Sequence, residues 1–438
     1  MILRRLQYEM AGRVVGPVVL ALEEWQRRQR RRGKKPKESP LGPPLECTRK
    51  LKELMSLHYL QGRYADGAVP VAWVTSGFPV EILRPLGFHV VYPENHAAMC
   101  GVVRMVTRLS EAVEKEGYSR DLCSYARTDL GSVATGETPA GRLPRPDLLA
   151  CCTNICQTVL YWYRALAERL KVPLVLVDTP FVYGESKPHH LAYVRDQLAE
   201  LVEAAERVAG RKVDPAELSE ATRLAKEGTR LWAACLATGK HRPAPWTGID
   251  GFFHMAPIVA LRGTEECNAY YRILRDELED RARRGIGGIR EERHRLLWDN
   301  LPIWFATREI STLLAGRGFN FVCTSYTNAW AEAGMRTDPA DPIGSAAVAY
   351  THIILNQDLR NRMGILSRLA REYQADGAVL HSDRSCKPYS IGQVDLKERL
   401  ARELGIRVLL LEADHNDPRA YASEQGENRL TAFMESFG

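Results

Sequence analysis

Short apolar segments that each end in a polar or reactive residue constrain the fold of this chain more than any other feature of its sequence. Segments of this length that are apolar throughout are typical of strands in a parallel sheet covered by helices on both faces. Amphipathic segments such as Thr158–Leu170, Leu359–Tyr373 and Gln393–Leu404 alternate with them. We therefore predict an α/β fold. The predicted strands are Val69–Thr75, His89–Tyr92, Leu174–Asp178, Asn320–Thr324, Gly377–His381 and Arg407–Glu412.

The predicted strands fall into two groups, and helical patterns occupy the remainder. Because 438 residues are too many for one ordinary core, we expect several packed units. We divide the chain into an N-terminal helical arm (1–60), a first α/β domain (61–190), a helical connection (191–300) and a second α/β domain (301–438). Each α/β domain would hold one Rossmann-like parallel sheet. Such sheets bind ligands beyond the carboxyl ends of their strands, so two facing sheets would share one cleft.

Charge and hydropathy exclude several classes of partner. Much of the net charge of +6 lies in the run from Arg27 to Lys37, which has no interleaved aromatic residues for base stacking. We assign this run to a solvated helix end and linker and expect no nucleic acid. No stretch approaches the roughly 18 apolar residues of a membrane span, and no secretory signal pattern follows Met1–Arg5. We therefore expect a cytoplasmic protein without a membrane partner, whose ten cysteines form no disulfides.

A subset of the cysteines lies in loops or at helix starts, namely Cys123 within DLCSY, Cys156 before a predicted helix and Cys386 after a predicted strand. Backbone N–H groups at a helix N-terminus stabilise a metal-bound sulfur, which makes these residues candidate thiolate ligands. The alternative for any single cysteine is a small buried apolar residue. We assign that role to Cys47, Cys151, Cys235 and Cys267, and we leave Cys100, Cys152 and Cys323 open.

Sequence motifs spread in order along the chain carry a likeness to a known family. They are VAWVTSGFPVEIL (71–83), YPENHAAMCG (92–101), DLCSYARTDLG (121–131), NICQTVLYWY (154–163), LVLVDTPF (174–181) and HSDRSCKPYSIGQ (381–393). In this order they resemble the 2-hydroxyacyl-CoA dehydratase and benzoyl-CoA reductase family, in the manner of its larger subunit or D-component. The resemblance runs from about Leu51 to the C-terminus and leaves only the N-terminal arm uncovered.

The resemblance implies a dimer with a homologous subunit or an identical copy, in which each subunit has two flavodoxin-like domains. It implies a [4Fe-4S] cluster held by Cys123, Cys156 and Cys386, with one iron left open to a small ligand. It also implies an ATP-hydrolysing iron–sulfur activator protein that supplies single electrons, which agrees with the lack of a GxxxxGK[ST] phosphate loop here. The electron would enter an acyl-CoA thioester. Dehydratases then expel a leaving group, whereas reductases reduce an aromatic ring.

Two alternatives remain open from the sequence. A variant of the family uses extra cysteines to bridge two cubanes into a double-cubane [8Fe-9S] cluster that reduces small molecules, and Cys100 and Cys323 are candidates for this role. The other alternative is a cluster-free assembly subunit that keeps only the fold. The iron content of each chain distinguishes these hypotheses.

Ser76 and Glu94 match a serine and a glutamate that the resembling family places beside its substrate. A hydroxyl at a strand end would orient a carbonyl or a water, and a carboxylate whose pKa is raised by burial would act as an acid or a base. These two residues are therefore the candidate catalytic residues. The alternatives are a helix N-cap for Ser76 and a turn carboxylate for Glu94.

Other polar residues near the motifs have two interpretations each. His96 and His381 would shuttle protons, or each would simply be satisfied by one hydrogen bond. Three basic residues would suit CoA phosphates or a docked activator, or they are solvated surface charge. These are Arg360, Arg384 and Lys387.

Overall fold

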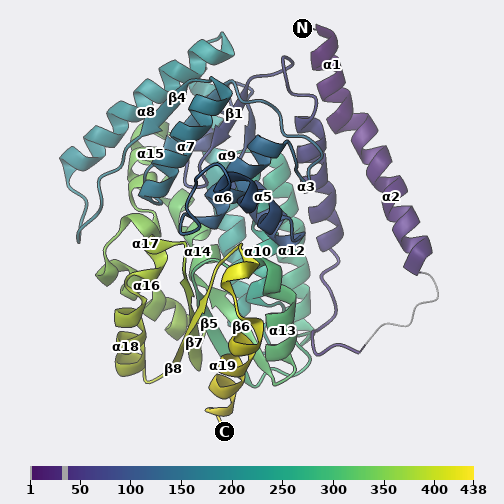
Figure 1. The fold of residues 1–438 in the computed structure, drawn as a ribbon, viewed down its shortest axis with the longest axis vertical. Coiled ribbons are helices and arrows are strands. Elements are labelled where there is room, and N and C mark those ends of the chain that lie inside the picture. Colours follow the sequence, from purple (N-terminus) through teal and green to yellow (C-terminus); the bar gives the residue numbers. More distant parts are fainter. Residues whose placement is uncertain (1, 32–37) are drawn as a thin grey trace.

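Two four-stranded parallel sheets form the body of the molecule, a computed structural model that describes residues 2–31 and 38–438 (Figure 1). The first sheet has the order β2-β1-β3-β4, and the second has the order β6-β5-β7-β8. Every pair of neighbouring strands is parallel, which confirms the predicted α/β class with two parallel-sheet domains. The strands are β1 (Val71–Val74), β2 (His89–Val91), β3 (Leu148–Cys152), β4 (Leu174–Val177), β5 (His294–Asp299), β6 (Phe319–Thr324), β7 (Gly377–Asp383) and β8 (Arg407–Ala413).

The two sheets have the same topology. In each, the second strand along the chain lies at one edge, followed by the first, the third and the fourth, as in the first four strands of a flavodoxin-like sheet. The strand order therefore reverses between β1 and β3 in one sheet and between β5 and β7 in the other. Ligands bind beyond the carboxyl ends of strands at such a switch point. The loops after these four strands are thus the first place to look for a site.

Two central strands, β3 and β5, escape prediction from the sequence. Strand β5 lies within 191–300, a range for which the sequence indicated only helices, and its start is polar and charged. Arg295 in this strand is fully buried, because its guanidinium donates hydrogen bonds to the carbonyl oxygens of Gly239 at 2.6 Å and Tyr373 at 2.9 Å. Strand β3 follows a segment rich in proline and glycine, which resembled a loop. Both strands are nevertheless hydrogen-bonded on two sides.

Helices surround both sheets, and the long helices of the connection pack against both halves of the molecule. Helix α9 packs against α12 and also contacts α14 of the second half, while α8 packs against β4 and α15. The helices after the arm are α4 (Pro93–Val102), α5 (Val106–Glu114), α6 (Ser124–Thr135), α7 (Gln157–Leu170), α8 (Pro188–Ala209), α9 (Pro215–Ala237), α10 (Gly248–His254), α11 (Ala256–Ala260), α12 (Glu265–Arg283), α13 (Thr307–Ala315), α14 (Ser325–Glu332), α15 (Pro342–Thr351), α16 (Leu359–Glu372), α17 (Lys387–Ser390), α18 (Gln393–Leu404) and α19 (Ser423–Glu435).

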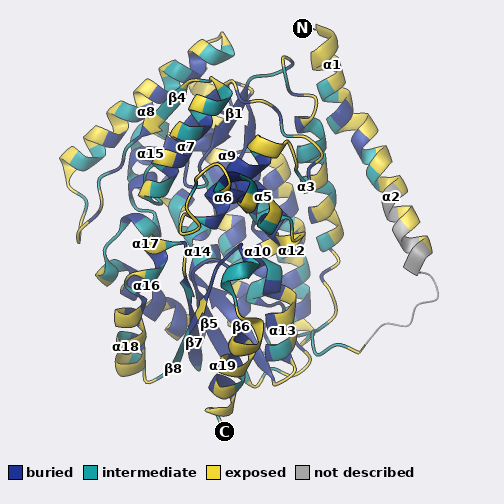
Figure 2. Cartoon of the chain, viewed as in Figure 1, coloured by how far each residue is buried: buried dark blue, intermediate teal, exposed yellow. Residues whose placement is uncertain are grey.

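The apolar core lies on both faces of each sheet. Figure 2 shows buried strands, in dark blue, enclosed by helices whose outer faces are exposed and drawn in yellow. Strands β1 and β3 are buried along their whole length. A second group of core residues joins the two domains, because it contains residues of both sheets and because the Trp304 indole N–H donates to the hydroxyl of Tyr125 in α6. This shared core holds the two sheets in a fixed relation.

The N-terminal arm is helical, as the sequence predicts. Helices α1 (Ile2–Met10) and α2 (Gly16–Arg31) continue through one π-helical turn and form a rod along one side of the molecule, beside α3 (Thr48–Gly62) (Figure 1). The first part of the basic run 27–37 belongs to the end of α2, and residues 32–37 lie outside the described residues. None of the described helices is both long enough and apolar enough to cross a membrane.

Candidate active site

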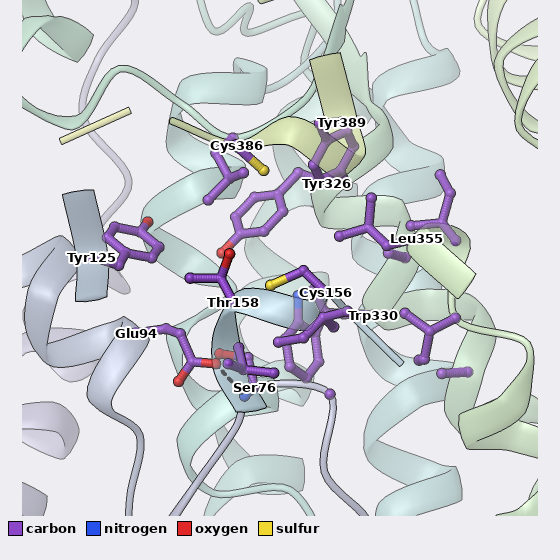
Figure 3. A pocket seen from close by; sticks show the side chains of 18 of the residues that line it. Ser76, Glu94, Tyr125, Cys156, Thr158, Tyr326, Trp330, Leu355, Cys386 and Tyr389 are labelled. Atoms are coloured by element: carbon purple, nitrogen blue, oxygen red, sulfur yellow. Dashed lines mark hydrogen bonds between the residues drawn. The ribbon is translucent and has the colours of Figure 1, made fainter. Parts of the chain in front are cut away.

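A cavity of about 140 Å³ lies where the carboxyl ends of the two sheets face each other (Figure 3). The loops after β1 and β3 line it from the first domain, and the loop after β7 and helix α14 line it from the second. Apolar and aromatic side chains make up most of its wall. The cleft predicted between two facing sheets is therefore present, and it contains residues from both domains.

Cys123, Cys156 and Cys386 all line this cavity. Each is the residue immediately before a helix, namely α6, α7 and α17 in that order. They are also the three cysteines that are only partly buried, whereas the other seven cysteines are fully buried. In Figure 3, the sulfurs of Cys156 and Cys386 both point into the cavity. The structure thus brings together three residues that are far apart in the sequence.

The surroundings of these thiols favour a metal over a free nucleophile. Burial raises the pKa of Cys156 to about 12, the nearby Cys123 sulfur adds to this effect, and the backbone N–H groups of Val159 and Thr158 oppose it. Burial raises the pKa of Cys386 far above its ordinary value, and the sulfurs of Cys123 and Cys156 contribute to that shift. A thiol with such a pKa stays protonated at neutral pH unless a bound cation removes its proton. Three sulfurs that line one space, with backbone N–H groups directed at one of them, are suitable ligands for an iron–sulfur cluster.

A buried polar cluster braces the loops that carry two of the cysteines. The His415 ring contacts Asp383 Oδ2 through Nδ1 at 2.6 Å and Ser124 Oγ through Nε2 at 2.9 Å, and Ser385 Oγ donates to Asp414 Oδ2 at 2.6 Å. Burial opposes a charge on His415, but the two carboxylates outweigh it and hold its pKa well above the ordinary value. Burial also opposes the charge on Asp414, yet His415 and several hydrogen bonds keep its pKa at about 2. The three side chains form a compact charged group that could hold a cation, but their hydrogen bonds to one another and to the two serines already account for it.

Ser76 and Glu94 lie together on the first-domain side of the cavity (Figure 3). The backbone N–H of Ser76 donates to Glu94 Oε1 at 3.0 Å, while the buried Oε2 has no hydrogen-bond partner among the described residues. Burial is the main cause that raises the pKa of Glu94 to about 7. Ser76 is not a helix N-cap, because the next helical turn begins after Pro79. A carboxyl group of this kind exchanges protons near neutral pH.

Comparison with known proteins shows the family to which this chain is related. The model of the family described as "2-hydroxyglutaryl-CoA dehydratase, D-component" matches residues 75–437, which include every strand after β1 and every cysteine of the cavity. The chain belongs to this family. It is 34% identical to the alpha subunit of (R)-2-hydroxyisocaproyl-CoA dehydratase from Clostridioides difficile over 84% of the chain and 90% of that protein. It is 32% identical to the (R)-phenyllactyl-CoA dehydratase alpha subunit from Clostridium sporogenes over 83% and 89% of the two chains, and 30% identical to a subunit of benzoyl-CoA reductase from Thauera aromatica over 88% and 93%.

The other cysteines of this dehydratase-family chain lie away from the cavity. Cys100 belongs to a small apolar cluster, with its sulfur 3.7 Å from His96, and Cys323 is buried in the core on one face of the second sheet. Cys152 is buried in the core of the first domain. None of these residues lines the cavity, so within the described part of the chain the site offers three cysteine sulfurs and no fourth.

The two candidate proton shuttles also lie outside the cavity lining. His96 is fully buried with Nε2 2.8 Å from Thr138 Oγ1, and His381 has Nδ1 2.7 Å from the carbonyl oxygen of Leu301. Each histidine therefore has one hydrogen-bonded ring nitrogen, while the other, His96 Nδ1 or His381 Nε2, is buried without a hydrogen-bond partner among the described residues. Two of the basic residues, Arg384 and Lys387, flank Cys386 on the exposed side of its loop.

Several cavity residues were not identified from the sequence. Tyr326 and Trp330 of α14, Tyr389 of α17 and Thr158 of α7 line the cavity, as does Arg262. The available signal was position alone, since Tyr326 follows β6 as Glu94 follows β2. Aromatic residues are common in any core, so their presence did not distinguish a site wall from ordinary packing.

Proposed function

We propose that this chain is the iron–sulfur subunit of an enzyme that passes single electrons to an acyl-CoA thioester, of the 2-hydroxyacyl-CoA dehydratase or benzoyl-CoA reductase type. Cys123, Cys156 and Cys386 would hold a [4Fe-4S] cluster in the cavity. The observation that carries this proposal is that the three partly buried cysteines converge on one cavity at the starts of three helices. Family membership supports the acyl-CoA chemistry.

A cluster bound by three thiolates keeps one iron without a protein ligand, and when bound it supplies a low-potential electron next to that open position. The residues of this chain define what surrounds the reacting thioester. The Ser76 hydroxyl stands at the end of β1, where it would orient a carbonyl oxygen. Glu94 would accept or donate a proton, because its pKa of about 7 lets it hold either state.

Water exclusion is the other contribution of the protein. Tyr326, Trp330 and Tyr389 surround the cysteine sulfurs and leave few polar groups exposed to the cavity. A reduced thioester is protected from stray protons in such an environment, and electrostatic interactions there are stronger than in water. Tyr326 remains a neutral phenol because burial raises its pKa.

Partners follow from the chemistry and from the relatives. The relatives are each named as one subunit of an enzyme, which supports a homologous second subunit, or an identical copy, as the dimer partner. An ATP-hydrolysing iron–sulfur activator would supply the electron, since the chain carries no phosphate-binding loop of its own. The exposed charges at Arg384 and Lys387 flank Cys386, which makes their surface a suitable docking point.

Cluster content and its response to substrate test the proposal together. After anaerobic purification of the assembled enzyme, we expect about four irons and four sulfides in this chain. About eight irons would support the double-cubane alternative, and well-folded protein without iron would support the cluster-free subunit. The paramagnetic resonance of the reduced cluster should change when a CoA thioester is added but not when free CoA is added. An unchanged signal would contradict a thioester site beside the cluster.

A further inference from the structure

The cavity has two chemically different ends. Ser76 and Glu94 lie at one end, and Figure 3 shows Leu355 at the other, with Cys156 and Trp330 between them. The distal wall is formed by α14 and the turn after it, together with the segment after α15. Ile353, Ile354 and Leu355 in that segment contribute only aliphatic side chains. A molecule whose thioester lies beside the sulfurs therefore extends its acyl group into an apolar space.

Among the described residues, no lysine or arginine is free to bind a second carboxylate in this space. Arg262 is the single arginine among the residues described as lining the cavity, and no lysine is present there. Its Nε donates to Glu81 Oε1 at 2.9 Å, and its Nη2 donates to the carbonyl oxygen of Phe78 at 2.7 Å. The guanidinium is fully buried between the rings of Trp330 and Tyr350. Its charge is thus already balanced inside the protein wall.

The remaining charged groups oppose an anionic acyl group. His415 is held by the carboxylates of Asp383 and Asp414, as described above. Glu94, the acidic residue of the described lining, likewise offers no positive charge to a second carboxylate. Burying a carboxylate without a positive partner is strongly unfavourable, so a charged acyl tail would bind poorly.

Small residues on α14 and the following turn make room for a bulky acyl group. Ala329, Ala333 and Gly334 line the same wall as Trp330. At Gly334 a Cβ atom would lie 2.1 Å from Thr229 Oγ1, so a larger residue does not fit there without moving helix α9. The backbone of this turn is therefore tightly packed from behind, and the space in front of it is left open.

We propose that this site selects acyl-CoA thioesters with an uncharged, apolar acyl group, branched aliphatic or aryl, and rejects acyl groups that carry a second carboxylate. This selectivity rests on the proposed function. The names of the relatives include isocaproyl, phenyllactyl, benzoyl and hydroxyglutaryl groups, so kinship alone does not decide between the two classes.

Equilibrium binding to the assembled, anaerobic enzyme tests the selectivity. The probes are 4-methylpentanoyl-CoA, 3-phenylpropionyl-CoA, propionyl-CoA, glutaryl-CoA and free CoA. We expect the first two to bind at least about tenfold more tightly than propionyl-CoA, and glutaryl-CoA to bind no more tightly than propionyl-CoA. If glutaryl-CoA binds as tightly as 4-methylpentanoyl-CoA, the selectivity is wrong although the proposed function stands. If no thioester binds more tightly than free CoA, the proposed function itself fails.

A matched pair of variants locates the selectivity in this cavity. Leu355→Arg places a cation at the distal end, and we expect it to raise the ratio of glutaryl-CoA to 4-methylpentanoyl-CoA affinity by about tenfold or more. Leu355→Met keeps the apolar character and should leave that ratio within about twofold of wild type. Ala329→Lys, on α14, repeats the test if Leu355→Arg does not fold. An unchanged ratio in a folded cationic variant would overturn the assignment of this cavity as the acyl pocket.

Discussion

The two halves of the molecule share a topology but contribute different chemistry to the cavity. After the third strand of each sheet comes a cysteine at a helix start, Cys156 in one half and Cys386 in the other. After the second strand, the first half places Glu94 and the second half places Tyr326. After the first strand, the corresponding residues are Ser76 and Leu301. The fold thus places a cavity residue after each corresponding strand, while the chemical type of that residue differs between the two halves.

Under the proposed function, the first half would supply the groups that move or orient protons, and the second half would supply an apolar wall. The cysteines are the feature common to both. A third cysteine, Cys123, comes from the first half alone and is braced from the second by the contact between Ser124 and His415. Four predictions test this comparison, in order of decreasing effect.

Because a cysteine follows the third strand in both halves, we predict an equal and complete loss of the cluster in Cys156→Ser and Cys386→Ser. Each variant should lose the cluster, with its brown absorbance and bound iron, because two thiolates do not retain a cubane that needs three. Cys323→Ser is the matched control, since this buried cysteine lies in a different core. Iron and sulfide analysis under anoxia provides the measurement. Full iron content in either of the first two variants would break the equivalence of the two halves.

Glu94 follows the second strand of the first half, and Tyr326 follows the second strand of the second half. This difference predicts unequal effects of Glu94→Gln and Tyr326→Phe on kcat. Glu94→Gln should lower kcat by about 100-fold or more, because it removes the group that exchanges a proton near neutral pH. Tyr326→Phe keeps the ring and should cost less than about tenfold, which corresponds to one neutral hydrogen bond. Iron content should stay at the wild-type level in both. Equal losses in kcat would contradict the assigned division.

The environment of Glu94 also predicts how stability depends on pH. Burial raises its pKa from 4.5 to about 7 in the folded protein, so the folded state holds a proton that the unfolded state releases between these values. The free energy of unfolding should therefore fall as pH rises from about 4.5 to about 7, by up to about 3 kcal/mol. Thermal unfolding of the wild type and Glu94→Gln over this range checks the sign. A wild-type curve with the same slope as Glu94→Gln would contradict it.

The brace around the cysteine loops predicts the smallest effect. Ser385→Ala removes the hydrogen bond to Asp414 and should lower the free energy of unfolding by about 1 kcal/mol. Ser382→Ala is the matched control, because the nearby Ser382 is only partly buried. Denaturant titration of the two variants gives the comparison. A larger loss in Ser382→Ala than in Ser385→Ala would argue against the brace.

Much of the fold could be predicted because several strands carry long apolar runs. Strands β6, β7 and β8 were found in this way, whereas β5 was missed because the buried Arg295 stands near its start. This arginine pairs with the buried Glu292 and donates to backbone carbonyl groups distant in the sequence. The periodicity of apolar residues predicts which side chains are buried in the core, but it does not predict which charged side chains are buried with a hydrogen-bonding partner. The same limit applies to Arg262, whose pairing with Glu81 was invisible until the structure placed them together.

The candidate site was predictable where function depends on local context. Cys123, Cys156 and Cys386 stood out because they lie in loops or at helix starts and match the cysteines of the resembling family, and the structure brings all three to one cavity. The charged brace could not be predicted, since His415 reaches Asp383 and Ser124 from distant parts of the chain. Nor could the aromatic wall, because the second domain presents it through helices that resemble any other core helix.

A crystal structure of the anaerobic enzyme, with anomalous scattering measured at the iron absorption edge, would show directly whether the three cysteines share one cluster. We predict one compact group of about four iron peaks between the Sγ atoms of Cys123, Cys156 and Cys386, with Fe–S bonds to all three and one iron without a protein thiolate. Iron peaks bound elsewhere, or a cavity in which these three sulfurs bind no iron in active enzyme, would contradict it.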